Sequence, residues 1–418
     1  MSERLRMCNF CCTFVARFGM RVCAVCTCML RKMKEPRPRA RRKQMPEQGE
    51  NRENIQQDRL YLPGLNGIRA VAALSVLFGH MWSPFGDWGI GEPPIHIPWP
   101  EGPVTTFFVI SGFLITYLLM NEVGKTNNVS IGKFYMRRIL RIWPLYYGYF
   151  VLSLIVVAAF KGEINSAAWF YGFFSGNISH AIGIGIIPLY HFWSLGVEEQ
   201  YYAWYPWMVK YNKKHILYAV CGLCVLWFGF KLGSYLLLGK GLVYRIFAVT
   251  QFDCMMLGAA GAIMYYRGTE WFKRLCGNPY VAITAWILFF TSGLWAKYLP
   301  SPVNNEVIAM ISLLVIMAGL LRKPILENKV MNYLGKISYG IYVIHPMLIY
   351  LGTGLQYNTI FQSECLQKQE GGCFAIIFIA VTGLTIMIAG VSYKYFEMPF
   401  LRLKDKFSVI KSTNEKSE

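Results

Sequence analysis

The stretch that decides the fold is LNGIRAVAALSVLFGH, residues 65–80, an apolar run that contains two ionisable side chains. Arg69 lies near its start and His80 closes it. Ionisable groups are costly inside a bilayer, so a membrane span that keeps two of them is expected to use them. On a helix, this separation makes about three turns and roughly 16 Å of rise. Both side chains are therefore expected on one face, at different depths in the membrane.

The composition extends this interpretation to the whole chain. Of 418 residues, 55% are hydrophobic and 16% are charged, whereas about a quarter of the residues of a typical soluble domain are charged. The apolar residues form blocks of about 20 residues, the length that crosses a bilayer as a helix. The sequence predicts an all-α integral membrane protein with about ten transmembrane helices and both termini in the cytoplasm. The predicted spans are 66–84, 103–121, 142–160, 192–210, 216–238, 242–266, 279–299, 303–321, 336–355 and 374–396.

The positive charge follows this topology. A net charge of +19 is compatible with a nucleic-acid partner, but the distribution of the basic residues excludes that class. Past the first span, the predicted cytoplasmic segments carry 20 Lys and Arg residues and the predicted outside segments carry 4. This is the positive-inside pattern of membrane proteins. An eleventh span at 166–187 would reverse every later segment, so we interpret that range as an outside interfacial or re-entrant piece.

The amino-terminal part differs in kind. Residues 1–60 are predicted to be a Cys- and Arg-rich disordered leader, and Met45 is an alternative start. The leader holds six of the twelve cysteines, and two Cys-x-x-Cys pairs among them suggest zinc. Their separation is shorter than in a typical four-cysteine site, and the leader contains no histidine. We therefore assign no residue to a metal. The basic, proline-containing run that follows is expected to stay solvated or to rest on anionic lipid.

The rest of the chain is predicted to consist of a membrane domain and a short tail. Residues 61–402 are predicted to form one membrane domain, and residues 403–418 a polar cytoplasmic tail. Cys365 and Cys373 fall in one predicted outside loop. A disulfide in an oxidising compartment and two free thiols are both compatible with that position.

His80 is the strongest candidate for a catalytic residue. A neutral imidazole can take a proton from a hydroxyl, because its unperturbed pKa lies near physiological pH. Glu198 and Glu199 open a helix on the same predicted membrane side. Helix neighbours point about 100° apart, so one carboxylate would orient His80 while the other holds the fold. Arg69 completes the predicted catalytic set. The alternatives are an interfacial histidine and an arginine that snorkels to the inner surface.

A second group of residues suits an anionic donor. Arg138 and Arg141 are three positions apart and share a helix face at the predicted inner surface. Guanidinium groups bind phosphates in bidentate geometry, so these residues are candidates for a nucleotide-bearing donor, and a positive-inside anchor is the alternative. Ser111, beside Gly112, can bond across closely packed helices, and we group it with the donor site. Three further ionisable residues in predicted spans are expected to pair internally rather than react: Arg245, Asp253 and His345.

In this order and spacing, the motifs resemble the membrane-bound acyltransferase 3 family, which is typically bacterial. The resemblance runs from about Leu62 to Arg402. It is carried by LNGIR with His80 (residues 65–80), FFVISG (107–112), RILR (138–141), WSLGVEEQY (193–201), LGKISYGIY with His345 (334–345) and SYKYFEMPF (392–400). Asn66 and Gln251 depart from residues that the family often has near these motifs.

The resemblance implies a transferase of acyl groups other than amino-acyl groups. It would move an acyl group, often acetyl, from a cytoplasmic donor such as acyl-CoA to a hydroxyl of a surface or secreted carbohydrate. It implies a bacterial cytoplasmic membrane, the lipid bilayer as partner and no bound cofactor, with acyl-CoA as co-substrate. His80 would be the essential histidine, with Arg69 as its motif partner and Arg138 and Arg141 on the donor side. Whether His80 is a base or carries the acyl group stays open.

A non-enzymatic glycan or lipid transporter or flippase is the alternative function. Its charged residues would then act as gates. Inverted repeats would favour it. The motifs at 65–80 and 334–345 share only a loose Leu-x-Gly opening, so the sequence offers no convincing internal symmetry.

Overall fold

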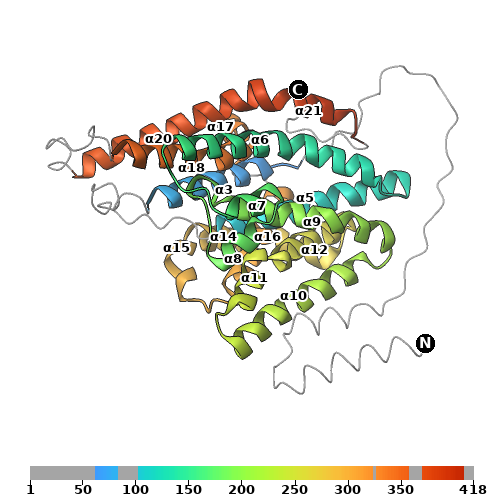
Figure 1. The fold of residues 1–418 in the computed structure, drawn as a ribbon. Helices are drawn as coiled ribbons and strands as arrows, with labels where there is room; N and C mark the ends of the chain where they lie inside the picture. Colours follow the sequence, from blue (N-terminus) through green and yellow to red (C-terminus); the bar gives the residue numbers. More distant parts are fainter. Residues whose placement is uncertain (1–61, 83–101, 323–325, 357–369, 409–418) are drawn as a thin grey trace, which may run out of the picture. The chain divides into compact units, whose positions relative to one another are not determined.

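The computed structural model describes residues 62–82, 102–322, 326–356 and 370–408 (Figure 1). Within these ranges the regular structure is helical, and none of these residues forms a β-strand. The predicted all-α class is therefore confirmed for this part of the chain.

Five helices surround the candidate site, and local sequence explains where they begin and end. They are α3 (Leu65–Trp82), α5 (Pro103–Thr126), α6 (Ile131–Ala159), α9 (Phe192–Tyr211) and α18 (Ser338–Gln356). Helix α5 begins with a proline, whose missing N–H would have had no helical partner. It ends at Asn127, whose left-handed backbone, with φ of 51°, stops the helix.

Within the described residues, six helical segments are long and apolar enough to cross a membrane. They are α5, α6, α10 (Ile216–Leu238), α11 (Leu242–Thr250) with α12 (Phe252–Tyr266), α16 (Asn304–Leu321), and a segment ending at Asp405 that joins α20 (Glu370–Ser392), η4 (Tyr393–Glu397) and α21 (Met398–Asp405). A bent pair makes a seventh if it counts as one span: α14 (Pro279–Phe290), followed by α15 (Ser292–Trp295) and η3 (Ala296–Tyr298), with a bend of 61°. Helices α3 and α18 are apolar over shorter stretches. The chain is therefore built as a multi-pass membrane protein, while the count of ten spans and the side of each terminus stay predictions.

Three segments differ in detail from the predicted spans. Helix α6 begins at Ile131, well before the predicted start at 142, so the basic motif and the span form one continuous helix. The range 166–187 holds α7 (Ala167–Gly172) and α8 (Gly176–Ile182), followed by η2 (Ile187–Leu189). Each of these is too short to cross a bilayer. The predicted span 242–266 is broken at Gln251, which has a φ of 42°.

Small residues allow the central helices to approach closely. A Cβ atom added to Gly112 of α5 would lie 1.9 Å from the Met255 carbonyl oxygen of α12, and one on Gly258 of α12 would lie 2.2 Å from the Val109 carbonyl oxygen. Backbone therefore packs directly on backbone here, as small residues permit in membrane helices. Gly112 thus has the packing role that its position beside Ser111 indicated.

Two further helices are shorter than a membrane span. Helix α13 (Glu270–Gly277) precedes α14, and α17 (Lys329–Lys336) packs on α3. The predictions about the leader 1–60, its alternative start at Met45, and the side chains of Cys365 and Cys373 lie outside the described residues.

Candidate functional site

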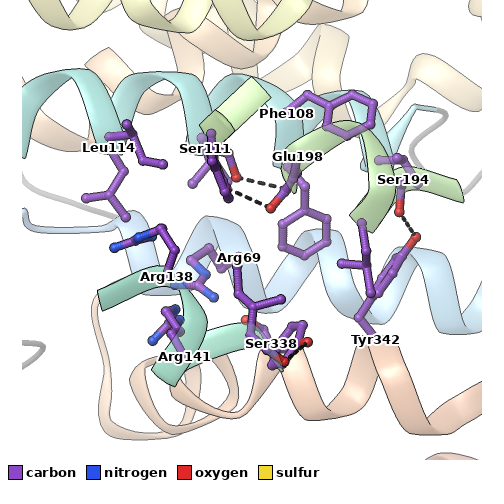
Figure 2. A pocket seen from close by; sticks show the side chains of 18 residues that line it. Arg69, Phe108, Ser111, Leu114, Arg138, Arg141, Ser194, Glu198, Ser338 and Tyr342 are labelled. Carbon is purple, nitrogen blue, oxygen red and sulfur yellow. Dashed lines mark hydrogen bonds between the residues drawn. The ribbon is translucent and has the colours of Figure 1, made fainter. Parts of the chain in front are cut away.

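A cavity that is partly open to solvent lies among α3, α5, α6, α9 and α18. Figure 2 shows the three arginines Arg69, Arg138 and Arg141 gathered at one end and the pair Ser194 and Tyr342 at the other. Apolar side chains, including Phe108 and Leu114, also line the cavity. One end of the cavity is therefore cationic, and the other end carries the hydroxyl groups of Ser194 and Tyr342.

The lining of the arginine end carries more positive than negative charge. Arg69 comes from α3, and Arg138 and Arg141 come from the first turns of α6. None of the three forms an ion pair with a residue of the described ranges. The guanidinium carbon of Arg138 lies 5.9 Å from the ring centroids of both Phe134 and Tyr202, and its Nε atom is buried without a hydrogen-bond partner. Buried donors of this kind are normally satisfied, so this end of the cavity suits an anion.

Arg137 behaves differently from its two neighbours in the basic motif. Its guanidinium group lies 3.1 Å from the carboxylate of the buried Glu122 and donates to the Phe407 carbonyl at 3.0 Å. Arg137 thus anchors α6 to α5, whereas Arg138 and Arg141 face the cavity. The spacing of three residues predicts a common face for Arg138 and Arg141, and both of these side chains line the cavity, together with Arg69.

Glu198 occupies the middle of the cavity and is held there by two hydroxyl groups. Ser111 donates a hydrogen bond of 2.9 Å to its Oε1 atom, and Tyr202 donates one of 2.8 Å to its Oε2 atom (Figure 2). Arg69 and Arg138 line the same cavity as this carboxylate. Ser111 contributes to the site by fixing this carboxylate.

Glu199 points away from Glu198, as neighbours on a helix must. Its Oε2 atom accepts a hydrogen bond of 3.1 Å from the Trp143 indole, and its Oε1 atom is buried without a hydrogen-bond partner. Within the described residues, neither Glu198 nor Glu199 is a hydrogen-bond partner of His80. The structure thus brings Glu198 to the arginines, and it brings a different residue to His80.

That residue is His345, from α18. The Nδ1 atom of His80 lies 2.9 Å from the Nε2 atom of His345. His345 is fully buried, and its Nδ1 atom lies 3.0 Å from the Ile341 carbonyl oxygen. A third histidine, His191, is buried beside them, with its ring centroid 5.7 Å from that of His345. The expectation that His345 pairs internally agrees with this contact, but the sequence did not indicate its partner.

Hydroxyl groups join the cavity to the histidines. The hydroxyls of Ser194 and Tyr342 lie 2.5 Å apart, and each lies 3.1 Å from the His191 carbonyl oxygen. Both side chains line the cavity (Figure 2). The ring centroid of Tyr342 is also 6.0 Å from that of His345. The hydroxyl end of the cavity therefore adjoins the His80–His345 pair, and the arginines lie at the opposite end.

A separate polar cluster lies among α10, α12 and α16. The ammonium group of Lys231, which is 1% exposed, lies 3.0 Å from the Asp253 carboxylate and also contacts the Glu306 carboxylate. Asp253, Cys254 and Glu306 bring potential metal-ligating atoms within 4.8 Å of one another. The lysine already supplies a positive charge at this position, so we assign the cluster to helix packing. Asp253 is thus paired internally, in agreement with the prediction for it.

Comparison with known proteins identifies the family. A family model described as an acyltransferase domain matches residues 62–393. The chain therefore belongs to the acyltransferase 3 family, as its motifs indicated.

Two relatives illustrate the similarity. The chain is 24% identical over 371 residues to the O-acetyltransferase OatA of Staphylococcus aureus (strain NCTC 8325 / PS 47), with 81% of this chain and 57% of OatA covered. It is 25% identical over 378 residues to a protein of S. aureus (strain COL) provisionally named an O-acetyltransferase, with the same coverage. The chain thus spans about 57% of the length of these relatives. No solved structure matches it.

Proposed function

We propose that the protein is a multi-pass O-acyltransferase of a bacterial cytoplasmic membrane. It would transfer an acyl group, with acetyl as the first candidate, from a cytoplasmic donor such as acyl-CoA to a carbohydrate hydroxyl. The acceptor would be outside the cytoplasm or associated with the membrane. The observation that carries the proposal is a single cavity with three arginines at one end and the His80–His345 pair adjoining the other.

The arginine end is proposed to bind the donor. Acyl-CoA carries several phosphate groups, and a guanidinium can hold a phosphate through two parallel hydrogen bonds. Among the described residues that line the cavity, three are arginines (Arg69, Arg138 and Arg141) and one is acidic (Glu198), so the lining has an excess of positive charge. The acyl arm would then extend past Ser111 and the apolar walls towards Tyr342. Glu198, held by Ser111 and Tyr202, would keep the arginines apart and oriented.

The histidine end is proposed to carry the chemistry. The acceptor hydroxyl would lose its proton to His80 while its oxygen attacks the thioester carbonyl carbon. A carbon–oxygen bond forms, the carbon–sulfur bond breaks, and the proton passes from His80 to the departing thiolate. In the second route, His80 attacks the thioester carbon first and the thiolate leaves. The acceptor oxygen then attacks the acyl carbon, the carbon–nitrogen bond to the imidazole breaks, and the hydroxyl proton ends on the thiolate. Both routes need an unprotonated nitrogen of His80. Neither needs a bound cofactor.

Transport without chemistry is the second candidate, and one feature favours it. Helices α11 and α12 are joined by a break at Gln251, and broken helices form binding sites in many transporters. The polar side chains at this break are already hydrogen-bonded within the protein, however. Thr105 donates to the Gln251 side chain at 2.8 Å, and Asn177 donates to the Thr250 hydroxyl at 3.1 Å. Neither Gln251 nor Thr250 lines the cavity.

Mass spectrometry of surface glycans separates the two functions. Glycans would be compared from cells with the wild-type gene, with no gene, with His80→Ala and with His215→Ala, a matched control at an exposed histidine. We expect an acyl mass to be lost without the gene and with His80→Ala, and kept with His215→Ala. Immunoblots of the membranes would verify equal amounts of each variant. Full acylation with a correctly inserted His80→Ala protein would refute the proposal, and altered glycan export without an acyl change would favour transport.

A further inference from the structure

We propose that His345 is a positioning residue that determines which nitrogen of His80 is basic. The proposal rests on the proposed function, because it assigns the orientation of the histidine that would react. It is carried by two contacts, the one between the two imidazole rings and the one between His345 and the backbone of its own helix.

The backbone contact determines the tautomer of His345. Its Nδ1 atom lies 3.0 Å from the Ile341 carbonyl oxygen, and a carbonyl oxygen can only accept a hydrogen bond. The Nδ1 atom must therefore carry a proton and donate it. His345 is fully buried and has no carboxylate partner among the described residues. An isolated buried charge is very costly, so the ring is assigned as neutral, with a single N–H group.

The contact between the rings then determines the tautomer of His80. The Nε2 atom of neutral, Nδ1-protonated His345 has a lone pair and no proton, so it can only accept. The 2.9 Å contact must therefore be donated by the Nδ1–H group of His80. That leaves the Nε2 atom of neutral His80 with its lone pair. This nitrogen is the one available to accept a proton or to attack an acyl carbon.

The environment of His345 keeps this arrangement in place. Its ring is enclosed by the aromatic rings of Tyr342 and His191, with centroids at 6.0 and 5.7 Å. His80, by contrast, is exposed at the far end of α3 from Arg69. One imidazole is therefore rigid and buried, and it holds another that can meet an acceptor. The aspartate of a Ser-His-Asp triad orients its histidine in the same way, but with a negative charge that His345 lacks.

The test uses three variants of His345 that differ in the acceptor they offer. Gln can place an amide oxygen near the position of the Nε2 atom, Asn can place one only near Nδ1, and Leu offers none. Removing a partner that orients a metal-binding histidine typically costs about 10- to 100-fold in activity, and we take the same range for His80. We expect His345→Leu and His345→Asn to lower kcat by about that factor, and His345→Gln to recover most of it. The KM for acetyl-CoA should stay within about threefold, because the arginine end is unchanged.

The assay would use inverted membrane vesicles and radiolabelled acetyl-CoA, with label counted in the glycan fraction. Equal loss of kcat in the Gln and Leu variants, at equal protein amounts, would show a merely structural role and overturn the proposal. Full activity of His345→Leu would overturn it as well. If neither the wild-type protein nor any variant incorporates label, the proposed function fails. The tautomer of His80 is then still decided by a second measurement that does not depend on activity.

That second measurement is solid-state NMR of the wild-type protein labelled at the histidine nitrogens, with His80→Ala as the difference sample. The Nδ1 atom of His80 should give a protonated signal and its Nε2 atom an unprotonated one. The reverse pattern would overturn the proposal whatever the activity. This measurement does not depend on the folding of any His345 variant.

Discussion

The contrast between Arg138 and Arg137 yields a sharp prediction, because two adjacent arginines have different surroundings. Arg138 lines the cavity with its Nε atom unpartnered, and Arg137 is paired with Glu122 at 3.1 Å. A hydrogen bond to a charged group contributes about 1.5–3 kcal/mol. At about 1.4 kcal/mol per factor of ten, Arg138→Ala should raise the KM for acetyl-CoA by roughly 10- to 150-fold.

Arg137→Ala should act on stability instead. It leaves the Glu122 carboxylate, whose side chain is 3% exposed, without its partner. Removing one member of a buried pair destabilises a protein by about 3–5 kcal/mol. We expect a lower melting temperature in detergent and less protein in the membrane, with the KM for acetyl-CoA within about threefold of wild type. The assay is a titration of acetyl-CoA in inverted vesicles, beside a thermal melt of each purified variant.

The reasoning would be refuted by either of two results. An unchanged KM in a correctly inserted Arg138→Ala protein would remove this arginine from the donor site. An equal rise of KM in both variants would mean that donor binding depends on the total charge of the motif. The orientation of each arginine side chain would then be irrelevant to donor binding. Arg138→Lys provides a further control, because it keeps the charge but loses the bidentate geometry. It should recover only part of the affinity.

Two further predictions concern the helix packing that supports the site. Gly112→Ala places a methyl group 1.9 Å from the Met255 carbonyl oxygen and should destabilise the protein by about 1–3 kcal/mol. Gly79→Ala has open space around it and should not lower the melting temperature, because alanine favours the helix over glycine. Lys231→Met leaves the Asp253 carboxylate buried and unpaired and should destabilise by about 3–5 kcal/mol; adding Asp253→Asn should restore part of this in the same melt. Equal melting of the two glycine variants, or no loss with Lys231→Met, would contradict the packing described here.

The parts of the site that were predictable depend on short-range periodicity. Arg138 and Arg141 share a face because they are three residues apart on one helix, and the helix forms as expected. Gly112 packs closely because small residues in spans usually do. The separation of Glu198 from Glu199 follows from the helical rotation between neighbours. Each of these inferences needs only the geometry of a single helix.

The partner of His80 could not be predicted, because it depends on how distant helices pack. His345 is 265 residues away in the sequence, and only the packing of α18 against α3 brings the two rings together. Glu198 was a candidate partner of His80, because it lies near the start of a helix on the same predicted membrane side as His80. It is seven residues beyond His191, which is about 10 Å along the helix. It is therefore deep enough to meet Ser111 and Tyr202 instead.

The helix break at Gln251 could not be predicted from the sequence either. Helix breaks are usually signalled by proline or glycine, and neither occurs from Leu242 to Asp253. The left-handed backbone of Gln251 accompanies a tertiary contact, the hydrogen bond from Thr105 of α5. The predicted span 242–266 therefore had the right extent and the wrong internal shape.

The central claim is that one cavity takes the donor on the cytoplasmic side and delivers the acyl group to His80 at the other end. Sealed vesicles of the two orientations test it most directly, because acetyl-CoA does not cross a bilayer. Radiolabelled acetyl-CoA added outside should label the glycan fraction of inverted vesicles, should not label that of right-side-out vesicles, and should label neither with His80→Ala. Label in right-side-out vesicles alone, or undiminished label with His80→Ala, would contradict the account.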